Sequence, residues 1–88
     1  MSHLGPVPEY EFLSNESLAL VALPPPSVRR ELRRVAGLSA SDVAEKVGCS
    51  RTLVLHWEAG DRIPRGERLL RYARLLREVQ EVPRWPQA

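Results

Sequence analysis

The chain has 88 residues, 43% hydrophobic and 27% charged, which are proportions of a small globular domain rather than a disordered chain. No apolar run approaches the roughly 18 residues that a membrane-spanning helix needs, and no signal peptide is recognisable. The single cysteine, Cys49, excludes an internal disulfide, and two histidines are too few to complete a zinc site with it. We expect one soluble domain without metal, cofactor or membrane contact, and too short for an enzyme with a deep cleft.

The net charge of +2 hides an uneven distribution along the chain. Residues 1–28 hold three acids and no lysine or arginine, whereas residues 29–77 hold twelve Lys and Arg against six acids. Residues 78–88 are again slightly acidic. A basic middle between acidic ends is typical of proteins that bind polyanions such as nucleic acid.

The first 26 residues predict an arm and one short helix. Residues 1–13 contain one glycine and two prolines without a sustained period, and they predict an extended arm. Ser14 or Asn15 is expected to cap an apolar helix that ends near Ala22. Three prolines at positions 24–26 then end it, because proline lacks the amide donor that a helix needs.

The remainder of the chain predicts four helices separated by glycines. Apolar residues recur at helical spacing, and Gly37, Gly48 and Gly60 are placed to end successive helices. Ser39 and Asp42 form a capping-box signature before the second of the four. The expected helices are 27–36, 40–47, 51–58 and 64–79. No strand-type alternation of useful length occurs, so the fold class is an all-α bundle of about five helices.

The helices 40–47 and 51–58 are joined by Gly48-Cys49-Ser50, which predicts a helix-turn-helix. Gly48 tolerates the positive φ that the turn needs, and Ser50 caps the following helix. Ala44 is small enough for the two helices to approach closely. Any small helical bundle can contain such a pair, so this geometry alone leaves the function open.

The run GLSASDVAEKVGCSR (residues 37–51), continued by HWEAGDRIP (residues 56–64), resembles the phage Cro and repressor (XRE-like) helix-turn-helix family. The leucine-rich stretch 69–76 follows, as it does in the family, and the resemblance covers about residues 27–77. It implies a lambda-repressor-like domain that binds double-stranded DNA in a phage or bacterial repressor, acting in the bacterial cytoplasm. We assign the arm and linker to residues 1–26, the DNA-binding domain to 27–79 and a tail to 80–88.

The helix 51–58 is the expected recognition helix. On a helical wheel Val54 and Trp57 face the core, whereas Thr52 and His56 point directly away from it and Arg51 lies at the exposed N-terminal end. In the family, the positions matching Arg51, Thr52 and His56 commonly contact base edges in the major groove. Arg51 would then bond a guanine, Thr52 a thymine methyl and His56 a purine acceptor.

Phosphate contacts are expected at two places. The start of the second helix of the domain presents Ser39, Ala40 and Ser41, and a helix N-terminus attracts phosphate. Arg62 and Arg65 lie in the turn that follows the recognition helix, which in the family runs along the DNA backbone.

The sequence departs from the family pattern at three positions of the domain. Ala40 stands where the family often has glutamine, and Leu53 and Leu55 replace residues that are usually small or polar. Leu53 can pack beside Trp57, and Leu55 can meet thymine methyls or a protein partner. These departures keep open an alternative function, a protein-interaction module such as an antitoxin-like or adaptor protein.

The family's usual fifth helix after the leucine-rich one is missing, because residues 82–86 contain two prolines. An apolar face of the leucine-rich helix would then be uncovered. We expect Leu18, Val21 and Leu23 to cover it, either within one chain or by exchange across a homodimer.

Two further residues have structural interpretations. In the family, Glu58 most often makes a salt bridge or a cap, and Cys49 is expected to pack within the turn. His3 and His56 are far apart in the chain, and no arrangement of catalytic residues or metal ligands is recognisable.

Overall fold

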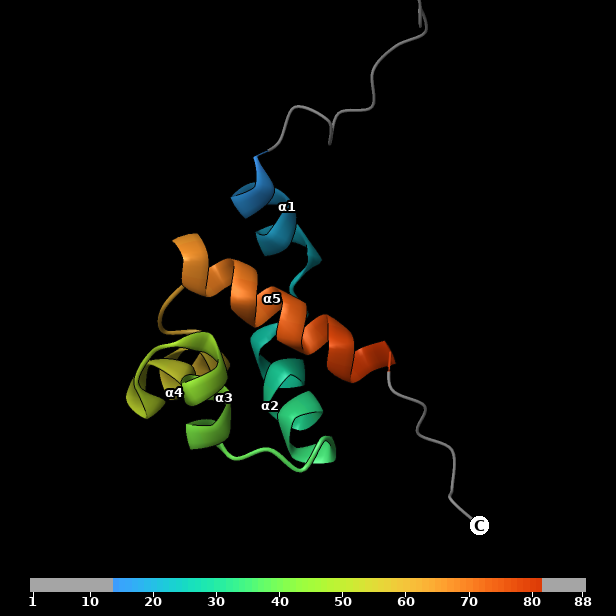
Figure 1. Cartoon of the computed structure of the whole chain (residues 1–88), viewed down its shortest axis with the longest axis vertical. Coiled ribbons are helices and arrows are strands. Elements are labelled where there is room, and N and C mark those ends of the chain that lie inside the picture. Colours follow the sequence, from blue (N-terminus) through green and yellow to red (C-terminus); the bar gives the residue numbers. More distant parts are fainter. Residues whose placement is uncertain (1–13, 82–88) are drawn as a thin grey trace, which may run out of the picture.

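The computed structural model describes residues 14–81, which fold into five helices (Figure 1). They are α1 (Asn15–Ala22), α2 (Pro26–Val35), α3 (Ala40–Val47), α4 (Arg51–Ala59) and α5 (Gly66–Glu81). No strand occurs among these residues, and the predicted all-α class is confirmed. Two predictions lie outside the described residues: the extended arm at residues 1–13 and the absence of a helix at residues 82–86.

The predicted helix bounds agree with the structure to within two residues, and the largest differences are at the two ends of α5. The helix begins at Gly66 rather than at Pro64. Gly66 has a φ of 61°, which is left-handed, so a right-handed helix cannot run continuously through it from Pro64. The side chain of Pro64 is instead buried in the core.

The core lies between α2, α3, α4 and α5, and α5 runs across the other helices (Figure 1). Trp57 of α4 packs on Tyr72 of α5, with ring centroids 4.7 Å apart and the ring planes tilted by 36°. The Tyr72 hydroxyl is buried without a hydrogen-bond partner among the described residues, and burial raises its pKa well above the ordinary value. The apolar core consists of Leu32, Ala40, Val43, Ala44, Val47, Val54, Trp57, Leu69, Tyr72, Leu76 and Val79.

Arg29 of α2 is buried and ties three segments together. Its Nε donates to the carbonyl of Pro24 at 2.7 Å, and its Nη1 donates to the carbonyl of Trp57 at 3.1 Å. The second bond is made to a carbonyl in the last turn of α4, which also accepts from the Gly60 amide at 3.3 Å. Burial lowers the pKa of Arg29.

A bidentate ion pair joins Arg33 of α2 to Glu58 of α4. The Arg33 Nε and Nη2 atoms lie 2.6 and 3.0 Å from the two Glu58 carboxylate oxygens, and Nη1 donates to the carbonyl of Leu38 at 3.0 Å. The hydrogen bonds to Glu58 raise the pKa of Arg33. The expected structural role of Glu58 is confirmed. Because the guanidinium groups of Arg29 and Arg33 are both engaged inside the protein, the basic surface is smaller than the count of twelve Lys and Arg in residues 29–77 implied.

Helix α1 packs along α5 within the same chain, through two of the three residues expected. Leu18, Ala19 and Ala22 face α5, and Leu23 packs against the core. Val21 is 76% exposed, so it does not cover α5 within one chain, and coverage by exchange across a homodimer stays a prediction. On an α-helix Val21 lies about 110° from the centre of the face formed by Leu18, Ala19 and Ala22. The two alanines let the helices approach closely, which leaves the bulkier valine on the outside.

Candidate nucleic-acid interface

The bounds of α3 and α4 are set by capping residues close to each helix end in the sequence. The Ser39 hydroxyl accepts from the Asp42 amide at 2.9 Å, and the Asp42 carboxylate accepts from the Ser39 amide at 2.8 Å. These bonds lower the pKa of Asp42. Gly48 then adopts a φ of 87°, and the Ser50 hydroxyl accepts from the Leu53 amide at 3.1 Å to start α4. The predicted helix-turn-helix is therefore present with both of its caps.

Helix α4 separates its core-facing and outward-facing residues as predicted. Val54 and Trp57 are buried, and Leu53 is half-buried against the core. Arg51 and Thr52 are exposed on the other side. This division leaves the N-terminal end of α4 available to a ligand.

His56 is half-buried because the chain returns beside it. Its Nδ1 lies 3.3 Å from the Asp61 carboxylate, just past the end of α4. If Nδ1 carries the proton, Asp61 orients the ring and Nε2 is the remaining acceptor. Asp61 was not predicted as a site residue, although its position five residues after His56, just beyond Gly60, was a usable signal in the sequence.

The start of α3 presents its three predicted phosphate residues differently. Ser39 and Ser41 are exposed, but Ala40 is only 5% exposed. The Ala40 methyl group belongs to the core, so this residue can offer a phosphate only its backbone amide. The Ser39 amide and hydroxyl oxygen are engaged with Asp42, which leaves the hydroxyl proton of Ser39 and the amide and hydroxyl of Ser41.

Arg62 and Arg65 are both exposed in the connection between α4 and α5. They line an open hollow of about 500 Å³ together with Ile63 and Arg68, below the exposed edge of Leu53. The residues of α4 that line this hollow are Leu53 and Trp57, on the side of the helix that meets the core, and Asp61 adds a carboxylate. The connection therefore places two cations beside the predicted recognition helix.

A second hollow adds a residue that sequence analysis did not single out. It has a volume of about 420 Å³ and brings exposed Arg30 of α2 together with Ser39, Arg51 and Leu55. Arg30 is separated from Arg51 by twenty-one positions in the chain, so no local pattern indicated their proximity. Leu55 is 36% exposed on the same wall. Arg30 thus extends the basic surface from α4 toward the start of α3.

The described residues contain no group of three or more His, Cys, Asp or Glu side chains that could hold a metal ion. Within residues 14–81, no helix combines the length and the hydropathy that crossing a membrane requires. The interface consists of cations, hydroxyls, one histidine with its carboxylate partner Asp61, and one exposed leucine.

Comparison with known proteins bears on this same region. A family model described as helix-turn-helix matches residues 30–81, more than half of the chain. The matched range includes α3, α4 and α5 and every residue of the interface described above. No curated protein and no solved structure gives a match.

Proposed function

Because the chain belongs to the Cro/repressor-like, or XRE-type, helix-turn-helix family and is a DNA-binding regulator, we propose that it recognises a specific double-stranded sequence through α4 in the major groove. The proposal rests on the way the residues of α4 divide between the core and the solvent. Val54 and Trp57 anchor the helix, and Arg51 and Thr52 stand clear on its outer side.

The base contacts follow from the chemistry of these side chains. The Arg51 guanidinium can donate to O6 and N7 of one guanine, and the Thr52 methyl can meet a thymine methyl. His56 bonds a base edge with the ring nitrogen that Asp61 does not use; with the proton on Nδ1, this Nε2 accepts from an exocyclic amino group instead of donating to a purine acceptor. Leu55 adds apolar contact to a thymine methyl at the edge of the site.

The phosphate contacts lie on both sides of α4. On one side, phosphate is contacted by the exposed hydroxyl and amide of Ser41, the amide of Ala40 and the side chain of Arg30. On the other side, it is contacted by Arg62 and Arg65. Such contacts fix the register of the protein on the duplex without reading its sequence.

The regulatory role we propose is repression, in the cytoplasm of a bacterial cell and with the gene carried by a phage or by the host. A protein bound across a promoter blocks access to it, and this requires only occupancy. One recognition helix reads few base pairs, so useful specificity needs two copies on neighbouring half-sites. We propose a homodimer that uses the segment of Leu18, Val21 and Leu23. Val21 is the most exposed of these three side chains.

A second function, a protein-interaction module, is favoured by Ala40 and Leu55. The buried methyl of Ala40 cannot make the polar contact of the family's frequent glutamine, and exposed Leu55 gives the outer side of α4 an apolar spot. In this alternative the acidic N-terminal arm or α4 would grip a protein partner rather than DNA.

Selection from a random duplex library, followed by titration at 50 and 200 mM salt, distinguishes the two functions. DNA recognition predicts an enriched sequence motif. It also predicts a logarithmic salt slope of about −3 for each bound copy, from three or four phosphate contacts. A matched control is Glu45→Gln, which changes one exposed charge on α3 that takes no part in the interface. Absence of an enriched motif and of binding at 50 mM salt would favour the interaction module.

A further inference from the structure

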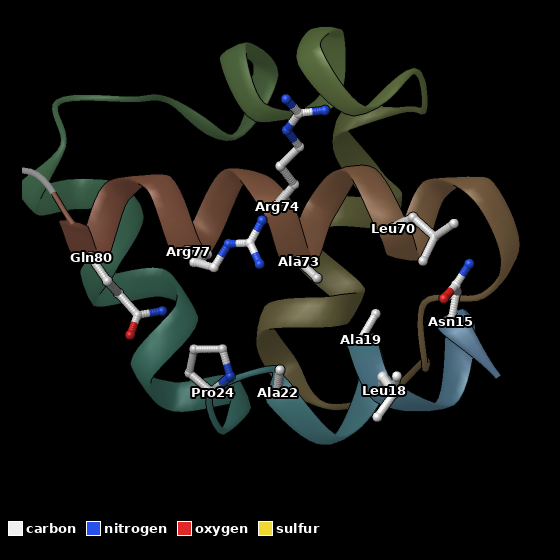
Figure 2. A pocket seen from close by; sticks show the side chains of 10 residues that line it. All are labelled: Asn15, Leu18, Ala19, Ala22, Pro24, Leu70, Ala73, Arg74, Arg77 and Gln80. Carbon is white, nitrogen blue, oxygen red and sulfur yellow. The ribbon is translucent and has the colours of Figure 1, made fainter. Parts of the chain in front are cut away.

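Helices α1 and α5 enclose an open groove of about 530 Å³, on the side of α5 that Figure 2 shows. Leu18, Ala19 and Ala22 of α1 form one wall, and Leu70 and Ala73 of α5 form the other. The groove lies apart from the helix-turn-helix pair α3 and α4, and none of its lining residues belongs to that pair. Six of its ten lining residues are apolar, and the polar ones are Asn15, Arg74, Arg77 and Gln80.

This groove leaves apolar side chains in contact with water. Leu18 and Leu70 are 38% and 37% exposed, and none of the eight residues of α1 is buried. An eight-residue helix is too short to be stable on its own in water, and α1 gains packing only along one face. A further covering element would stabilise α1 and remove this apolar surface from water.

The groove also has a cation at its opening. Figure 2 shows the Arg77 side chain extending along α5 toward Ala73. No carboxylate lies within ion-pairing distance of Arg77 in residues 14–81, whereas neighbouring Arg74 pairs with Glu78 at 3.3 Å. The occupant that fits is therefore apolar and acidic together.

We propose that residues 9–13 of the same chain, Glu-Tyr-Glu-Phe-Leu, occupy this groove. Tyr10, Phe12 and Leu13 supply the apolar side chains, and the carboxylate of Glu9 or Glu11 pairs with Arg77. The segment is the part of the chain outside the described residues that combines acids with aromatic rings.

The connection to α1 places this segment at the groove. Ser14 caps α1, and Asn15 lines the groove at the end where Leu70 lies (Figure 2). Five extended residues span about 16 Å, whereas the rise along α5 from Leu70 to Arg77 is about 10 Å. The segment can therefore turn back at Ser14 and reach Arg77. Because the segment is tethered to α1, its effective concentration at the groove is on the order of millimolar. A separate partner of equal affinity would need a higher concentration to displace it.

The C-terminal tail is a less suitable occupant. Residues 82–88 follow directly after α5, but their only charged side chain is Arg84, which Arg77 would repel. The acidic segment instead neutralises Arg77 and holds α1 against α5.

The first test is a set of nuclear Overhauser contacts measured on the full chain. Phe12 is the single phenylalanine, so its ring protons are identified unambiguously. We expect contacts from Phe12 to the methyl groups of Ala19, Ala22 or Leu70. Absence of these contacts overturns the proposal, and so do contacts to these methyl groups from Trp85 instead. In a mixture of labelled and unlabelled chains, contacts found only between chains would assign the groove to a second copy and also overturn it.

A charge exchange tests the pairing with Arg77. The double variant Glu9→Lys/Glu11→Lys and the single variant Arg77→Glu should each lose the Phe12 contacts, and their combination should regain them. The matched control Arg34→Glu changes an exposed cation of α2 and should keep the contacts. Helix content by circular dichroism is compared in all variants. Contacts that persist in every variant would contradict the ion pair.

Discussion

His56 and Asp61 are joined across the end of α4, with His56 Nδ1 3.3 Å from Asp61 Oδ2. Both residues lie on the side of the molecule that we propose faces DNA. The carboxylate repels phosphate, yet it also orients the ring that is expected to contact a base. Asp61 thus has opposite effects on the affinity for DNA and on the discrimination between sequences.

Replacing Asp61 separates these two effects. Asp61→Ala should raise the affinity for DNA of any sequence severalfold, because one exposed negative charge is removed. The same variant should reduce discrimination at the base that His56 contacts. Asp61→Asn keeps a hydrogen-bond acceptor beside His56, so it should raise affinity with less loss of discrimination. Anisotropy titrations with the selected duplex and its single-base variants measure both quantities. Equal discrimination by Asp61→Ala and the native chain would show that Asp61 does not orient His56.

Base and phosphate contacts should respond differently to truncation. Arg51→Ala and His56→Ala are each expected to cost about 1–3 kcal/mol of specific binding and to relax the preference at one base position. Arg30→Ala, Arg62→Ala and Arg65→Ala should weaken binding to all sequences alike and reduce the salt slope by about 0.9 each. The measurement is a salt titration on the selected and on a scrambled duplex. The assignment fails if all five variants change the two duplexes in the same way.

The ion pair between Arg33 and Glu58 should matter for stability rather than for DNA chemistry. Glu58→Ala removes one member of a largely buried pair and is expected to cost about 3–5 kcal/mol in the free energy of unfolding. Glu78→Ala, which breaks the exposed pair with Arg74, is the matched control and should cost at most about 1 kcal/mol. Urea denaturation measures both. Similar losses in the two variants would contradict the structural role of the buried pair.

The capping box predicts a pH dependence of stability. The hydrogen bonds from Ser39 lower the pKa of Asp42 in the folded chain, so the ionised form is favoured by folding. The stabilisation is present above the ordinary pKa of about 4 and is lost as the pH falls through the lowered folded value. The difference in unfolding free energy between the native chain and Asp42→Asn should therefore be constant near pH 6 and shrink toward pH 2. If this difference in unfolding free energy grows as the pH falls, folding does not favour the ionised form of Asp42.

The local features of the fold could be predicted from the sequence because neighbouring residues determine them. Ser39 with Asp42 starts α3, Gly48 ends it and Ser50 starts α4, as the spacing indicated. The burial of Val54 and Trp57 followed from helical spacing together with the resemblance to the family. The domain boundaries at residues 26 and 79 remain a prediction.

Contacts between distant residues could not be predicted in the same way. The role of Glu58 was expected from the family, but its partner Arg33 lies 25 residues earlier and is one of several arginines on α2. The proximity of Arg30 to Arg51 depends on how α2 crosses α4. The outward position of Val21 depends on which face of the short α1, whose last five residues are all apolar, the alanines bring against α5.

The most direct test of the central claim is a chemical-shift map of the full, ¹⁵N-labelled chain titrated with the selected duplex. The account predicts the largest changes at the amides of α4 from Arg51 to His56, with further changes at Ser41 and Arg62. The groove between α1 and α5 should change little. Changes confined to α1 and α5, with the amides of α4 unaffected at saturation, would contradict recognition of DNA by α4.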